Sequence, residues 1–263
     1  VSLSADVVVC GGGLSGVCAA VSAARHGAKV ILIQGRPVLG GNASSEMRMG
    51  IVGVKKAQWH EAGILEEMQL RNFRYNPLLR YTLWDDVIYS TVVEEANIKL
   101  LLNTSVNAVT MDGSKIAAVQ AWNGNSYTKY TIKGTVFADC TGDGILRLSG
   151  AKFRRGREFP EEFGENYMQS GGDARTMGNS ILLQLRKTDE DHPFTAPSWA
   201  YHFTDSDFDY ASPKSTIKGV KFNYKRLYPE DNNFWWVEFG GNFDTIADAN
   251  DIQYELKRIA YGV

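Results

Sequence analysis

The chain has 263 residues, of which 44% are hydrophobic and 22% charged, a composition typical of a globular protein with a sizeable core. Its formal net charge is -2 and its Lys and Arg residues form no runs, which argues against a nucleic-acid surface or a polybasic membrane anchor. No apolar stretch is long enough to span a bilayer, and three scattered Cys residues without a C-x-x-C pair predict no disulfide framework and no metal site.

The N-terminus has the pattern of a βαβ unit. Residues 6–10 form a short β-branched run without a polar face, which is typical of a buried strand. The glycine-rich turn at residues 11–16 follows, and residues 14–26 predict a helix that ends at Gly27. Residues 29–33 predict a second buried strand, so strand, tight turn, helix and strand fall within about 30 residues.

The next stretch predicts a helical insertion at about residues 55–96. It follows a loop at residues 35–42 that contains a Gly-Gly pair. Helices are predicted at residues 61–73 and 84–95, separated by an Asn-Pro step that disfavours helix. Residues 99–102 then predict a third parallel strand.

Three alternating segments predict a β-meander over residues 105–132. The segments are residues 105–111, 115–122 and 127–132, and Asp-Gly and Asn-Gly pairs in the intervening turns favour hairpins. Residues 135–139 predict one further buried strand, separate from the meander.

A change in composition after Gly150 predicts two domains. Residues 1–150 form the first, an α/β domain with a parallel sheet. Residues 151–263 predict a second, β-rich α+β domain, with strands at residues 179–186 and 234–239 and a terminal helix at residues 246–263.

The turn G-x-G-x-x-G predicts a dinucleotide site. Gly11 permits the tight turn, Gly13 lets the backbone approach a pyrophosphate, and Gly16 lets helix and strand pack closely. The N–H groups at the helix start, at Leu14 and Ser15, and the positive end of the helix dipole then face the phosphates.

The position that commonly holds the adenosine ribose carries no acid. The second strand ends in Gln34, followed by Gly35 and Arg36, where a carboxylate is expected. A glutamine oxygen accepts a hydroxyl hydrogen bond without charge assistance, and an arginine at this point suits a 2′-phosphate. This position taken alone favours NADP and leaves FAD open; restoring the acid with Gln34→Glu is expected to strengthen FAD or NAD binding.

Four segments together carry a family resemblance. They are VVVCGGGLSG at residues 7–16, PVLGGNASSEMRM at 37–49, FADCTGDG at 137–144 and GAKFRRGRE at 150–158. In this order they resemble the FAD-dependent oxidoreductase family of the glutathione-reductase-like flavoprotein superfamily, and in particular a bacterial branch grouped with heterodisulfide-reductase-like proteins.

The resemblance implies a Rossmann-like FAD-binding domain whose crossover is the β-meander. It implies that the glycine turn carries the FAD pyrophosphate, that the loop after the second strand lies along the pyrophosphate and ribityl chain, and that the T-G-D-G turn closes over the cofactor. The implied cofactor-binding residues, with those of the glycine turn, are Gln34, Gly35, Arg36, Gly40, Gly41, Asn42, Ala43, Ser44, Val106, Thr141, Gly142 and Asp143.

The implied function is FAD-dependent oxidation of an unidentified small organic substrate by hydride transfer to the flavin. An NADP-dependent dehydrogenase and a non-catalytic FAD-binding module of a larger assembly stay open as alternatives. Enzymes of this kind have a late segment that completes the flavin pocket, and no such segment follows Trp236. The chain is therefore expected to be the N-terminal part of a longer protein, with an incomplete substrate or cap domain, and to need the missing C-terminal part.

Two residues are candidates for contact with substrate or for proton transfer. Arg48 follows the loop at residues 40–45 and would lie near the flavin or a substrate carboxylate, and a structural role is equally open. His60 stands at a predicted helix start and is a candidate proton donor, although a lone histidine is more often structural. Because the chain begins with Val1 directly before a strand, a cytoplasmic location and an exported one with its leader removed are both open.

Overall fold

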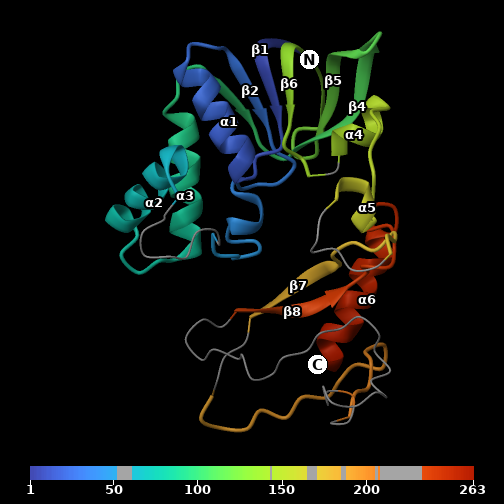
Figure 1. The fold of residues 1–263 in the computed structure, drawn as a ribbon. Coiled ribbons are helices and arrows are strands. Elements are labelled where there is room, and N and C mark those ends of the chain that lie inside the picture. The colour runs from blue at the N-terminus through green and yellow to red at the C-terminus, as the bar shows by residue number, and fades with distance from the viewer. Residues whose placement is uncertain (52–60, 143, 165–170, 185–187, 205–206, 208–232) are drawn as a thin grey trace. The chain divides into compact units, whose positions relative to one another are not determined.

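The structure, a computed structural model, describes residues 1–51, 61–142, 144–164, 171–184, 188–204, 207 and 233–263. The chain divides into two compact units, Val1–Phe153 and Arg154–Val263. Figure 1 shows the first as a sheet flanked by helices and the second as a small sheet with a helix against it. Among the described helices, none is both long and apolar enough to cross a membrane.

A six-stranded sheet organises the first unit, in the order β3-β2-β1-β6-β5-β4. Its strands are β1 (Ser2–Cys10), β2 (Val30–Ile33), β3 (Ile98–Leu101), β4 (Thr104–Asp112), β5 (Lys115–Asn123) and β6 (Thr128–Asp139). β3, β2, β1 and β6 are parallel, whereas β4 and β5 continue the sheet antiparallel. This arrangement is Rossmann-like with a β-meander crossover, as the sequence predicts.

The helices of the first unit are α1 (Leu14–Arg25), the one-turn 3-10 helix η1 (Gly41–Ala43), α2 (Gly63–Tyr75), α3 (Tyr81–Val93) and α4 (Gly144–Ser149). The predicted βαβ unit and helical insertion are therefore confirmed, with shifted ends. α2 and α3 form a helical hairpin, and both pack on α1 (Figure 1).

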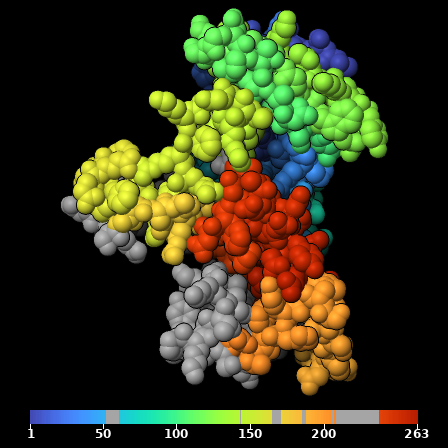
Figure 2. Space-filling view, turned by 90° about the vertical axis from the view of Figure 1, so that its right-hand side faces the viewer, coloured from blue at the N-terminus to red at the C-terminus, as the bar shows by residue number. Residues whose placement is uncertain are grey.

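Alternate residues of the central strands build two cores, because successive side chains of a strand point to opposite faces. Val9 and Leu32 pack with apolar residues of α1 and α3 on one face. Val8 and Ile31 pack on the other face with meander residues and with Ile145 of α4. Figure 2 shows the meander, in green, on the outer surface of this unit. The buried runs that predicted central strands thus reflect burial on both faces.

The prediction of a separate buried strand at residues 135–139 was wrong in two respects. These residues are the second half of β6, whose first half pairs antiparallel with β5 and whose later residues pair parallel with β1. The strand is continuous because no turn intervenes at Gly134. The segment is also partly open to solvent, with Val136 54% exposed, because no described helix covers it there.

The described part of the second unit is a two-stranded sheet and a helix. β7 (Asn179–Gln184) and β8 (Asn233–Phe239) pair antiparallel, and α6 (Ala249–Gly262) packs on both; a short helix, α5 (Pro160–Phe163), precedes them. Val237, Ile252, Leu256 and Ile259 are buried together as the core. The predicted strands and terminal helix are confirmed.

An ion-pair network fastens α1 to the helical insertion. Arg25 donates to Glu67 of α2 and to Glu95 after α3, each at 2.7 Å. The hydrogen bond from Arg25 holds the pKa of Glu67 below its ordinary value. Both Arg25 and Glu67 are more than a third exposed, so solvent and salt weaken the pair.

We expect Arg25→Met to lower the free energy of unfolding by about 0.5–1 kcal/mol at neutral pH. A carboxylate with a lowered folded pKa stabilises the fold above its unfolded pKa, so the difference from the wild type should shrink as the pH falls through the folded pKa of Glu67. Urea unfolding at two pH values and two salt concentrations measures this. Arg74→Met, on α2, is the control for loss of charge, and an equal effect from it would contradict the assignment.

Candidate cofactor site

The candidate site lies at the carboxyl ends of the parallel strands. Cys10, the last residue of β1, is in register with Ile33 of β2 and with Asp139 of β6, and Ile33 is in register with Leu101 of β3. The four strands therefore end level, and the turns that follow them meet at one edge of the sheet. In open α/β sheets, ligands bind outside this edge.

Each glycine of the G-x-G-x-x-G turn has a distinct steric reason. Gly11 has a φ of 102°, and a Cβ there would lie 2.2 Å from the carbonyl oxygen of Cys140. A Cβ at Gly16 would lie 1.8 Å from the carbonyl oxygen of Gly11, so α1 packs against the turn only with glycine at this position. A Cβ at Gly13 meets nothing within 4 Å, so this backbone borders open space.

The first turn of α1 is prepared for an anion. Gly13 is its N-cap, no side chain caps the helix, and no acidic residue stands in the first turn. The first N–H groups of a helix have no intrahelical partner, so those of Leu14, Ser15 and Gly16 stand at the positive end of the helix dipole. Together with the open space at Gly13, this fits a pyrophosphate.

A groove of about 440 Å³ runs along this edge. It brings together most of the residues that the sequence assigns to the cofactor. These are Gly11, Gly13, Gln34, Gly35, Arg36, Gly41, Asn42, Val106, Thr141 and Gly142. The groove therefore joins the turns after β1, β2 and β6 with the start of β4. Its volume lies in the range of small-molecule and cofactor sites.

The other assigned residues stand behind the groove lining. Leu14, Ser15 and Gly16 belong to the first turn of α1. Gly40 has a φ of 103°, and a Cβ there would lie 2.7 Å from Cδ1 of Ile88 on α3. Ala43 and Ser44 are buried, and Ser44 donates to the carbonyl of Gly41 at 2.7 Å. Asp143 lies outside the described residues.

The groove also has lining residues that sequence reasoning missed. They are Ile33, Thr104, Ser105, Cys140 and Gly144. Ser105 and Cys140 adjoin assigned positions, and their place directly beside a strand end was the available signal. Burial raises the pKa of the Cys140 thiol, so we expect it to stay protonated at neutral pH. Among the described residues, no group of three or more His, Cys, Asp or Glu side chains could hold a metal ion.

Gln34 contacts the protein's own backbone with both ends of its amide. Its Oε1 accepts from the N–H of Gly12 at 2.9 Å, and its Nε2 donates to the carbonyl of Val38 at 2.9 Å. The residue is only 7% exposed. Gln34 therefore ties the glycine turn to the loop after β2, a role that an isolated sequence position does not reveal.

The same loop is fixed at three further points. The N–H of Gly40 donates to the carbonyl of Gly12 at 2.8 Å, and Asp85 of α3 accepts from the N–H of Ser45 at 2.8 Å. Arg36 forms an ion pair with Glu46 at 2.9 Å. Because Glu46 already balances the charge of Arg36, the arginine is a weaker argument for a 2′-phosphate than its sequence position suggests.

Of the two candidates for chemistry, the structure describes one. Arg48 donates from Nε to the carbonyl of Ser45 at 3.1 Å, and its guanidinium lies 5.8 Å from the ring centroid of Tyr81. Its φ is 54°, a left-handed conformation that is uncommon outside glycine. Arg48 does not line the groove. His60 lies outside the described residues.

Solved structures with a similar fold are flavoproteins or relatives of them. The chain is 21% identical to an L-proline dehydrogenase from P. horikoshii, covering 53% of this chain and 23% of that one, with a TM-score of 0.34. It is 19% identical to a geranylgeranyl bacteriochlorophyll reductase-like protein from Thermoplasma acidophilum, covering 58% and 43%, with a TM-score of 0.41. A flavin-dependent brominase is 19% identical, with 59% and 43% covered and a TM-score of 0.42.

The chain spans less than half the length of each of these three solved chains. A comparison with curated protein sequences finds no match. The family model described as FAD dependent oxidoreductase, in contrast, matches residues 6–259, which include the glycine turn, the groove and α6 up to its last turn. The chain belongs to the FAD-dependent oxidoreductase family.

Proposed function

We propose that this chain holds FAD in the groove, with the pyrophosphate at the N-terminus of α1, and serves the two-electron oxidation of a small organic substrate. The observation that carries this proposal is the uncapped helix start beside the open backbone of Gly13, at the level ends of four parallel strands. When bound, the flavin would supply the redox chemistry by accepting a hydride from the substrate.

The chain's own residues bind and orient the cofactor in this proposal. The N–H groups at the start of α1 hold the pyrophosphate, and Gly41 and Asn42 line the groove beside them. Gln34 keeps the turn and the loop at a fixed spacing through its two backbone hydrogen bonds. Thr141 and Gly142 border the groove from the end of β6.

The test is retention of flavin by the purified chain. We expect added FAD to remain bound after desalting, with a visible flavin spectrum, and excess NADP to leave it in place. Anaerobic reduction of the bound flavin by candidate substrates then tests the hydride step. Displacement of FAD by NADP would contradict the proposal, as would a titration in which the chain binds no FAD.

A further inference from the structure

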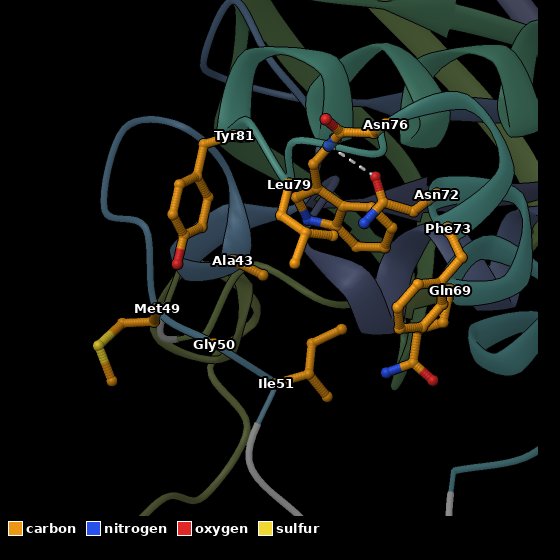
Figure 3. A pocket seen from close by; sticks show the side chains of 11 residues that line it. Ala43, Met49, Gly50, Ile51, Gln69, Asn72, Phe73, Asn76, Leu79 and Tyr81 are labelled. Carbon is orange, nitrogen blue, oxygen red and sulfur yellow. Dashed lines mark hydrogen bonds between the residues drawn. The ribbon is translucent and has the colours of Figure 1, made fainter. Parts of the chain in front are cut away.

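A second cavity of about 340 Å³ lies between the loop after β2 and the hairpin of α2 and α3 (Figure 3). We name it the hairpin cavity and define it by six of its lining residues: Ala43, Ile51, Gln69, Phe73, Tyr81 and Trp84. Figure 3 shows Tyr81 on one side of the opening and Phe73 with Gln69 on the other, with Ile51 between them.

The lining of the hairpin cavity is uncharged and largely apolar. None of the described residues that line it carries a charge. Aromatic rings of Phe73, Tyr81 and Trp84 and the aliphatic side chain of Ile51 supply most of its surface. Such walls suit a planar apolar group, and an anion inside them would lose its hydration without gaining an opposite charge.

Two polar groups of the lining lack partners among the described residues. The side-chain amides of Asn72 and Asn76 hydrogen bond to each other, and Asn76 also bonds the backbone of Arg80 in both directions. The structure shows no such bond for the amide of Gln69 or for the indole N–H of Trp84, although Trp84 is only 7% exposed. Buried donors normally have a partner, which a ligand oxygen would supply.

The hairpin cavity adjoins the cofactor groove through η1. Gly41 and Asn42 of this three-residue helix line the groove, and Ala43, its last residue, lines the hairpin cavity. A molecule in the hairpin cavity is thus separated from the groove by a single helical turn. Arg48, stacked over Tyr81, borders the same side, which gives it a positioning role toward that ring.

We propose that the hairpin cavity binds the neutral aromatic part of the substrate, with a substrate oxygen held by the amide of Gln69 and the indole N–H of Trp84. The proposal rests on the proposed function for the word substrate, but the binding itself is measurable without turnover. The volume of about 340 Å³, near the lower end of ligand-pocket volumes, suits one or two fused rings.

The first experiment compares 2-naphthol with 2-naphthoate on the FAD-loaded chain, by saturation-transfer NMR and titration calorimetry. The two probes share a ring system and differ in charge at neutral pH. We expect 2-naphthol to bind and 2-naphthoate to bind at least about tenfold more weakly, because no lining charge offsets desolvation of the carboxylate. Equal affinity of the two probes would overturn the proposal.

Two variants locate the bound probe. Phe73→Ala is expected to weaken 2-naphthol about 3- to 10-fold, the effect of losing one aromatic contact. Leu70→Ala is its matched control, because Leu70 also stands on α2 and is similarly exposed, at 62% against 69%, but does not line the cavity. Gln69→Leu is expected to narrow the affinity difference between 2-naphthol and naphthalene about 2- to 10-fold.

Equal weakening by Phe73→Ala and Leu70→Ala would overturn the assignment of the probe to this cavity. So would loss of 2-naphthol binding when FAD is added, because the cavity would then belong to the cofactor. Failure of the proposed function looks different: the chain would retain no FAD, while the naphthol series would still distinguish Phe73→Ala from its control.

Discussion

Gly13→Val is expected to abolish FAD binding and to leave the fold intact. Gly13 has φ -64° and ψ 176°, an extended conformation that valine adopts without strain, and a Cβ there meets nothing within 4 Å. The new side chain would therefore occupy the space into which a pyrophosphate fits. Losing two charge-assisted hydrogen bonds corresponds to a weakening of about 100-fold or more, while the changed helix cap costs about 1 kcal/mol of stability.

Two other glycines separate the steric effect from a loss of fold. Gly16→Ala places a Cβ 1.8 Å from the carbonyl oxygen of Gly11, so we expect it to destabilise the protein. Gly124→Val, in the turn between β5 and β6, meets open space and should change neither property. Fluorescence titration with FAD and urea unfolding measure all three variants. Wild-type FAD affinity in Gly13→Val would mean that the pyrophosphate lies elsewhere.

Local patterns of the sequence predict the elements that hold the groove. The glycine turn follows a buried run and precedes a helix, so its place in a βαβ unit follows from short-range spacing. Asp-Gly and Asn-Gly pairs likewise predict the meander. These signals work because each is satisfied within about ten residues, by turn conformation and by alternation along one strand.

Contacts between distant segments could not be predicted in this way. The continuity of β6 depends on pairing with β5 on one side and β1 on the other, and β1 is more than a hundred residues away. The hairpin cavity forms only because Asp85 of α3 holds the loop at Ser45. The partners of Gln34, at Gly12 and Val38, are likewise set by how turn and loop meet in space.

Gln34 is the position where sequence and structure predict opposite results. From the sequence alone, Gln34→Glu restores a ribose-binding acid and should strengthen FAD binding. In the structure, a carboxylate keeps the bond from the N–H of Gly12 but has no hydrogen to donate to the carbonyl of Val38. We therefore expect Gln34→Glu to lower the free energy of unfolding by about 1–3 kcal/mol at neutral pH and to weaken FAD binding.

The pH dependence of that loss identifies its cause. A neutral carboxyl can donate to Val38, so the pKa of the introduced group should be raised in the folded state, and this contribution is fully present below the unfolded pKa of about 4.3 and lost as the pH rises through the folded value. Urea unfolding at acid and neutral pH should therefore show the penalty of Gln34→Glu shrinking in acid. Gln34→Met, which loses both bonds and cannot titrate, should show no such recovery. Tighter FAD binding by Gln34→Glu at unchanged stability would show instead that the side chain leaves Val38 and reaches the ribose.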